Sequence, residues 1–339
     1  MLAAAVLCWA PLSPTYAQNS MAALMMASAT VADAAGAFLP SASGSSPNLQ
    51  VRNRFAAYEA VAADPETGPP RYRAWLEGYT VRSKSAATGE FAGDRRRTYG
   101  SVAGIGMIVA PNVAVSLSVD HSRTRIEAPS QIAHVDLTQL GAGTIFQSGP
   151  WTASAALVRG FASIDSARNP ATDVSVAAYR GGVWSALADL GYNLALGGAI
   201  VVAKVGVDWL RTQTDPYTET GGTDPVSAPA VAIWRARVFA GAEVGRYWLL
   251  DNTWVGVSAY GRVVDVVAQR AADYEVLSAL GAAPPQLVSG QVGPRLGYDT
   301  GGMIAVQLSP RSRLYATYDG RFRRGFEAHG GSVGIDFRW

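Results

Sequence analysis

The last eight residues alternate between two kinds of side chain, and the chain ends on a tryptophan. Successive side chains of a strand point to opposite faces, so one face of this segment is apolar and the other is small or polar. A strand that closes a transmembrane barrel ends in this way, with lipid on one side and an aromatic in the interfacial girdle. The terminal strand of a soluble sandwich is the alternative. The apolar face comprises Val333, Ile335, Phe337 and Trp339, and the other face Ser332, Gly334, Asp336 and Arg338.

The composition of the chain separates these alternatives. Only 16% of the 339 residues are charged, whereas a soluble domain usually carries about a quarter. The mean hydropathy of +0.10 is far below that of a helical membrane protein, which needs several apolar spans of about 20 residues. Low charge together with 36 Gly, 9 Trp and 14 Tyr suits a barrel that is apolar outside and polar inside. The basic residues are dispersed, so the sequence gives no sign of nucleic-acid binding.

The N-terminal residues 1–17 are predicted to be a secretory signal peptide. Residues 2–12 are apolar, and residues 15–17 supply a cleavage site. No basic residue precedes the apolar run, which leaves open that the recorded start lies inside a longer signal. The single cysteine, Cys8, follows Leu7 rather than the small residue of a lipoprotein signal. Removal of the signal would leave a mature chain without cysteine, which suits an oxidising compartment.

Residues 18–70 differ from the rest of the chain in being rich in Ala, Ser and Pro. Residues 21–39 are weakly apolar, and a helix or a loose linker is favoured there over a membrane anchor. Residues 48–63 are expected to form one helix capped by Asn48. From about residue 71 the hydrophobic pattern changes to period two, so residues 71–339 are predicted to form the barrel.

The clearest strand runs from Trp234 to Trp248 and shows both faces of such a barrel. One face is apolar apart from Arg246 and suits lipid, with a Trp near each interface. The other face carries charged residues and suits a wet lumen. The same division elsewhere predicts the membrane-interface aromatics Trp209, Trp234 and Trp248. It also predicts a lumen lined by Glu77, Lys204, Asp208, Arg235, Arg237, Glu243, Asp319 and Arg321.

Short and long turns are predicted to alternate along the chain. Five hairpins with short turns, plus one strand at each end of the domain, give about twelve strands. An even number of strands places the first and the last strand ends of the barrel on the periplasmic side. Gln286 to Leu308 leaves the start of the tenth strand open, because Pro and Gly interrupt it. A β-propeller would need a repeated blade motif, and none is seen. The short turns are 110–112, 148–150, 196–198, 251–253 and 309–312, and the long ones 84–97, 122–131, 165–173, 212–229, 268–288 and 321–330.

Five segments carry a family resemblance: residues 74–79, 100–119, 149–151, 308–322 and 330–339. In this order they resemble the translocator β-domain of autotransporters, the type V secretion proteins. The terminal pattern polar-x-Gly-x-x-aromatic-x-aromatic is similar to the assembly signal that the outer-membrane insertion machinery reads. It is formed by Ser332, Gly334, Phe337 and Trp339.

The resemblance implies a monomeric barrel of about twelve strands with an N-terminal helix in its pore. It also implies an outer-membrane location, with the insertion machinery, periplasmic chaperones and outer-membrane lipid as partners. In that family the barrel lets an upstream passenger reach the cell surface. Only about fifty residues separate the signal from the barrel here, so either the gene is truncated or the cargo is minimal. Asn48 and Asn53 form no Asn-Asn pair, and self-cleavage is therefore not predicted.

Other candidate sites are weaker. Three histidines, His121, His134 and His329, are too few and too scattered for a zinc site. Asp120 precedes His121 at a predicted outer strand end, but neighbours in a strand point to opposite faces and form no dyad. The glycine pairs at 104–106 and 141–143 are expected to be small lumen positions approached by a plug or helix.

We therefore predict neither a catalytic residue nor a cofactor or metal. Three functions remain as alternatives to display of the N-terminal segment. They are a solute-conducting pore, an adhesin that binds through its long loops, and a barrel-type surface enzyme using Asp120 or His121.

Overall fold

The computed structural model describes residues 71–87, 93–169, 173–251, 253–270, 274–278, 286–288 and 295–339. The proposed signal peptide, the linker and the expected pore helix lie outside these residues. Across the described residues, no helix reaches the length and hydrophobicity that crossing a membrane would require.

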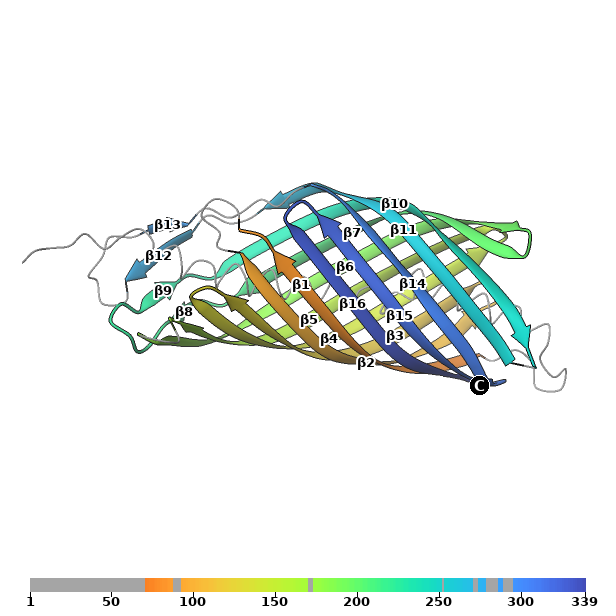
Figure 1. Cartoon of the computed structure of the whole chain (residues 1–339), viewed down its shortest axis with the longest axis horizontal. Helices are drawn as coiled ribbons and strands as arrows, with labels where there is room; N and C mark the ends of the chain where they lie inside the picture. Colours follow the sequence, from red (N-terminus) through yellow and green to blue (C-terminus); the bar gives the residue numbers. More distant parts are fainter. Residues whose placement is uncertain are drawn as a thin grey trace, which may run out of the picture.

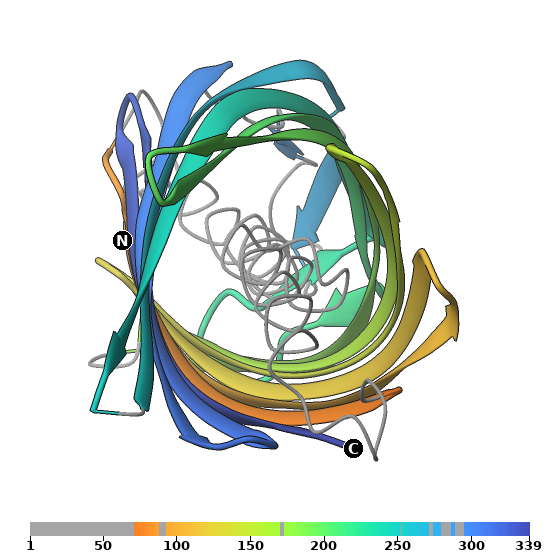
Figure 2. The ribbon, with the colours of Figure 1, turned by 90° about the vertical axis from the view of Figure 1, so that its right-hand side faces the viewer.

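Twelve antiparallel strands close into a barrel, as the side view and the view along the axis show (Figure 1, Figure 2). Strands that follow one another in the barrel are neighbours in the sheet, and the last strand pairs with the first. The predicted all-β, up-and-down barrel of twelve strands is confirmed. Its strands are β1 Tyr72–Ser85, β2 Asp94–Ala110, β3 Val113–Ala128, β4 Gln131–Ser148, β5 Trp151–Arg168, β6 Ser175–Leu196, β7 Ala199–Thr214, β10 Val231–Leu250, β11 Thr253–Arg270, β14 Leu296–Ser309, β15 Ser312–Arg323 and β16 Phe326–Arg338.

The five short turns lie where the sequence predicts them, all at one end of the barrel. Glycines supply the left-handed backbone that tight turns need: φ is +54° at Gly149 and Gly197 and +83° at Gly198. β1 begins and β16 ends at this same end, where the Tyr72 N–H donates to the Trp339 carbonyl at 2.9 Å. The other end carries the two longest connections, on the left of Figure 1.

Two of the predicted long loops, 122–131 and 321–330, are wrong because most of their residues belong to strands, while two others, 84–97 and 165–173, lose part of their length to strands. β3 runs to Ala128 and β4 starts at Gln131, so only two residues turn between them. The strands continue because their polar side chains pair across the sheet. Thr98 and Thr124 lie 2.8 Å apart, and Arg123 donates to Asp136 at 2.7 Å. Polar residues on both faces thus mark strand that extends past the hydrocarbon band.

The two remaining long connections contain a small second sheet. Its four strands, in the order β13-β12-β9-β8, lie at the barrel end opposite the short turns (Figure 1). The start of the tenth barrel strand is thereby settled, since β14 begins at Leu296 and the preceding residues 286–288 belong to the small sheet. The four strands are β8 Tyr217–Thr218, β9 Val226–Ala228, β12 Tyr274–Ser278 and β13 Gln286–Val288.

An apolar cluster lies on the inner side of the barrel near these connections. It draws residues from β3 to β10, including the fully buried Ile126, Ile164 and Val183. The β8–β9 hairpin covers part of it, since Tyr217 stacks on Tyr179 with ring centroids 4.4 Å apart. The sequence predicts a polar lumen, and this end departs from it because the hairpin folds against the inner wall and buries apolar surface.

Candidate functional site at the barrel seam

The seam between β1 and β16 joins the two ends of the barrel domain. Its register runs from Arg73 opposite Arg338 to Ser85 opposite Phe326. The backbone ladder alone closes the sheet, but side chains on the inner face also cross the seam. These crossings come from β15, so three strands are tied together at each.

One crossing passes over a glycine. Tyr315 on β15 lies opposite Gly334 on β16, and Gly334 lies opposite Glu77 on β1. The Tyr315 ring extends across Gly334 so closely that a Cβ there would lie 2.3 Å from its Cζ. Its hydroxyl then donates to the Glu77 carboxylate at 2.8 Å. Gly334 is thus required by the close approach of a ring, which is a use of glycine common within strands.

A second crossing centres on Asp336 of the terminal strand. Arg313 on β15 donates to its carboxylate at 2.9 Å, and the Arg73 guanidinium on β1 lies 3.1 Å from it. Arg338 approaches the other oxygen at 3.5 Å. Asp336 is 1% exposed, so these ion pairs are poorly screened by water. One carboxylate therefore holds arginines from three adjacent strands.

The packing of a ring on a glycine recurs around the inner wall. The Trp75 indole lies over Gly104, and this overturns the expectation that a plug or helix approaches that glycine. Tyr260 covers Gly301 and donates to Asp319 on the following strand at 2.5 Å. The Tyr260 side chain thus spans from β11 to β15, because the intervening strand β14 has no side chain at Gly301.

Two more rings pack on glycines of the adjacent strand. Tyr79 covers Gly100 and donates to Asp120 at 2.8 Å, and Phe239 covers Gly206. Together with the two crossings at the seam, the Tyr79 and Tyr260 hydrogen bonds give several places on the inner wall where a side chain links three strands. We infer that they fix the register of strands whose backbone ladder alone would tolerate slippage.

The four residues of the predicted assembly signal fall on both faces of β16. On the inner face, Ser332 hydrogen-bonds Thr317 at 2.7 Å, next to Gly334. On the outer face, Phe337 is 47% and Trp339 54% exposed. The Trp339 ring stacks on Tyr72, with centroids 6.0 Å apart. The outer face thus presents aromatics to lipid, while the inner face carries the seam contacts.

The predicted lumen residues all fall on the inward face of their strands. Arg237 donates to Asp208 at 2.7 Å, and both side chains are 6% exposed. Whether this lining holds a segment or sets ion selectivity stays a prediction. Trp209, Trp234 and Trp248 alternate with inward residues and face outward. The inward set is Glu77, Lys204, Asp208, Arg235, Arg237, Glu243, Asp319 and Arg321.

Asp120 and His121 lie on opposite faces of β3. Asp120 is buried and accepts hydrogen bonds from Tyr79 and from Gln139, each at 2.8 Å. His121 faces outward, 3.0 Å from the Thr138 hydroxyl. They lie in the middle of β3 rather than at its outer end, because the strand continues to Ala128. Within the described ranges no three His, Cys, Asp or Glu side chains come close enough to hold a metal ion.

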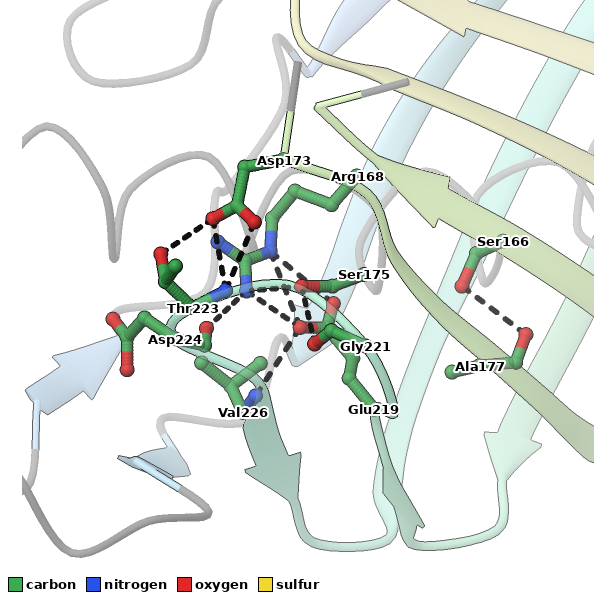
Figure 3. Close-up of polar contacts among 10 residues, drawn as sticks. All are labelled: Ser166, Arg168, Asp173, Ser175, Ala177, Glu219, Gly221, Thr223, Asp224 and Val226. Carbon is green, nitrogen blue, oxygen red and sulfur yellow. Dashed lines mark hydrogen bonds and ion pairs between the residues drawn. The ribbon is translucent and has the colours of Figure 1, made fainter. Parts of the chain in front are cut away.

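A buried ion pair ties the β8–β9 hairpin to the barrel (Figure 3). Arg168, the last residue of β5, contacts Glu219 at 2.6 Å, and both side chains are at most 6% exposed. Arg168 also donates to the Asp224 carbonyl, and Glu219 accepts the Val226 N–H at 3.1 Å. Breaking such a pair from one side leaves a buried charge, so the hairpin is held firmly.

An exposed contact continues this attachment on the β5–β6 connection. Asp173 accepts the Thr223 hydroxyl and its N–H, the latter at 2.9 Å (Figure 3). The Thr223 hydroxyl and then its N–H hold the pKa of Asp173 below its usual value. A lowered pKa stabilises the folded loop above the ordinary carboxyl range, and this contribution is lost as the pH falls through the lowered value.

Comparison with known families decides what kind of barrel this is. The family model for the autotransporter β-domain matches residues 74–319, more than half of the chain. The chain belongs to this family. The barrel is therefore an outer-membrane autotransporter β-domain, and by the rule for bacterial barrels its short turns face the periplasm and its long connections the exterior. Comparison with curated proteins found no match.

Solved structures share the fold. The translocator domain of the autotransporter NalP from Neisseria meningitidis is 15% identical, with a TM-score of 0.67 over 87% of this chain and 98% of that one. The β-domain of the Bordetella autotransporter BrkA is 11% identical, with a TM-score of 0.60 over 79% of this chain and 100% of that one. The barrel architecture is thus maintained at very low identity.

Sequence reasoning missed most of the side chains that cross the seam. Asp336, Arg313 and Arg73 read as ordinary polar positions of amphipathic strands, since nothing local marks them as partners. Gly334 was selected by the terminal pattern, but its packing against Tyr315 was not foreseen. A search for inward aromatics directly opposite inward glycines would have found that contact once the register was known.

Adding one methyl group at Gly334 tests this packing. We expect Gly334→Ala to lower the free energy of unfolding by about 1–3 kcal/mol, because the Tyr315 ring must be displaced. Urea unfolding of the refolded barrel, followed by Trp fluorescence, measures the change. Gly78→Ala is the matched control, since a Cβ there has no atom within 4 Å among the described residues. Equal losses in the two variants would contradict the packing argument.

Proposed function

We propose that this β-domain carries its own N-terminal segment, residues 18–70, through the lumen to the cell surface. The observation that supports the proposal is the position of Arg71. Its N–H donates to the Trp339 carbonyl at 3.0 Å, at the barrel end with the short turns. A segment that enters at this periplasmic end reaches the exterior only through the barrel, since the outer wall faces lipid. The inner wall, with its many polar and charged residues, suits a threaded chain.

We further propose that residues 1–17 direct export as a signal peptide. The chain matches the family of autotransporter β-domains, and we propose that this barrel catalyses no reaction. The buried position of Asp120 and the outward position of His121 support that view, because they separate the two groups of the proposed surface enzyme.

Surface labelling of intact cells tests the display of residues 18–70. We expect a cysteine introduced as Ser43→Cys to react with a membrane-impermeant maleimide, because the segment would lie outside. The matched control is Asn112→Cys in the β2–β3 turn, which should react only after the outer membrane is opened. Heat-modifiable gel mobility shows that each variant is folded. Protection of position 43 in intact cells, with labelling after permeabilisation, would refute display.

We also propose that β16 is the assembly signal that the outer-membrane insertion machinery reads. We propose further that the barrel assembles as a monomer. The outward aromatics of β16 at the periplasmic end would be accessible to this machinery before the seam closes.

The double variant Phe337→Ala, Trp339→Ala is expected to abolish outer-membrane assembly, because both aromatics leave the outer face of the terminal strand. Membrane fractionation and heat-modifiable mobility measure assembly. Leu314→Ala, Tyr318→Ala on the outer face of the neighbouring strand is the control and should assemble. Normal assembly of the Phe337→Ala, Trp339→Ala variant would contradict the proposal, and so would equal failure of this variant and its control.

A further inference from the structure

The outer wall carries a row of alternating arginine and tryptophan that no step of translocation uses. Directly paired positions on five adjacent strands make up this row. Arg159 on β5 pairs with Trp184 on β6, and Trp184 pairs with Arg211 on β7. Arg211 pairs with Trp234 on β10, which in turn pairs with Arg270 on β11. With neighbouring strands about 4.8 Å apart, the row is about 19 Å long.

All five side chains lie on the outward face of the barrel. Trp184 is 42% exposed, and Arg211 and Arg270 are also exposed. The guanidinium of Arg159 lies 5.1 Å from the Trp184 ring centroid and 4.9 Å from that of Phe161. Cation–π contacts of this kind hold an arginine head group flat against the wall while leaving its edge accessible.

The row contains no acidic residue. Within the described part of the chain, neither Arg211 nor Arg270 forms an ion pair, and Arg159 donates only to the Val183 carbonyl, at 3.3 Å. Arg123, by contrast, lies outward on β3 and is neutralised by Asp136 at 2.7 Å. Among the described residues, the row therefore presents three positive charges without an acidic partner.

The depth of the row follows from an aromatic pair at the periplasmic end. Trp151 and Tyr192 contact each other with centroids 4.8 Å apart. Arg159 and Trp184 lie eight residues further along the same two strands. At a rise of about 3.4 Å and a tilt near 40°, that is about 20 Å along the membrane normal, close to the outer edge of an apolar band about 25 Å tall.

The rest of the row lies closer to the exterior. Arg270 is the last residue of β11, and Trp234 is the fourth residue of β10, next to the long external connection. The row thus rises from the edge of the hydrocarbon into the headgroup layer of the outer leaflet. Tryptophan is typical of this depth, and arginine there meets lipid phosphates.

We propose that this row binds the phosphate groups of an anionic, phosphorylated glycolipid in the outer leaflet. A guanidinium matches phosphate by paired hydrogen bonds, and alternating indoles would pack against sugar or acyl chain between successive phosphates. The wall on the periplasmic side of the row is apolar, with Leu157 51% and Val205 53% exposed, which suits acyl chains. Charge complementarity and depth together favour a lipid over a soluble anion.

Binding in detergent tests the proposal on the full, refolded chain. The probe is a diphosphorylated glucosamine-disaccharide lipid, titrated against the protein, with its dephosphorylated form and inorganic phosphate as comparisons. We expect Arg159→Gln, Arg211→Gln to weaken binding of the phosphorylated lipid by about tenfold or more, since two charge-assisted contacts are lost. The dephosphorylated lipid should bind weakly, and its affinity should be about the same for the native chain and for the variant.

The matched control is Arg246→Gln. Arg246 also faces outward beside a tryptophan, 5.6 Å from the Trp248 ring centroid, but at the periplasmic end. Its loss should change the affinity less than about twofold. If the double variant fails to fold, Arg211→Gln alone is used, because this exposed side chain forms no ion pair in the described part of the chain. Unchanged binding by the row variant would overturn the proposal, as would an equal loss in Arg246→Gln. Inorganic phosphate that competes at the affinity of the lipid would show an anion site instead and would also overturn it.

Discussion

The closure of the β1–β16 seam is the constraint on which the whole structure depends. In hydrocarbon there is no water to hydrogen-bond a free N–H or C=O, and each unsatisfied group costs several kcal/mol. An open edge is therefore excluded, and the first strand must find the last. The ladder from Arg73–Arg338 to Ser85–Phe326 satisfies this requirement, and it brings Arg71 beside Trp339. Because closure pairs the first strand antiparallel with the last, both ends of the chain in the barrel lie at the same, periplasmic rim.

Side chains on the inner wall add what a uniform ladder lacks, which is a preferred register. Tyr315 reaches Glu77 only because Gly334 lies between them, and a slip of one residue would place a side chain in the path of the ring. Asp336 with its three arginines acts in the same way closer to the periplasm. The outer wall is left free for lipid, with aromatics at the periplasmic edge and the Arg–Trp row near the external one.

The sequence predicted the barrel well because period-two alternation and glycine-rich short turns are local signals. The prediction failed where the structural role of a residue depends on a partner residue on another strand. The polar segment 122–131 indicated a loop, yet it is strand because Arg123 and Thr124 have partners on adjacent strands. The inward charges such as Asp208 were placed correctly from alternation alone, but Asp336 gained its role only from Arg313 and Arg73, which are distant in sequence. The apolar cluster under the β8–β9 hairpin was missed for the same reason.

Disulfide trapping across the seam in isolated outer membranes tests this account most directly. In a chain carrying Cys8→Ser, the pair Leu76→Cys, Ile335→Cys should cross-link on mild oxidation, because paired strand residues lie about 4.5–5.5 Å apart and a disulfide needs less than about 7 Å. Leu76→Cys with Gly331→Cys should remain reduced, since Gly331 lies opposite Thr80. Efficient cross-linking of the first pair alone is the predicted result. Failure of that pair in folded barrels, or equal cross-linking of both, would contradict a closed seam in this register.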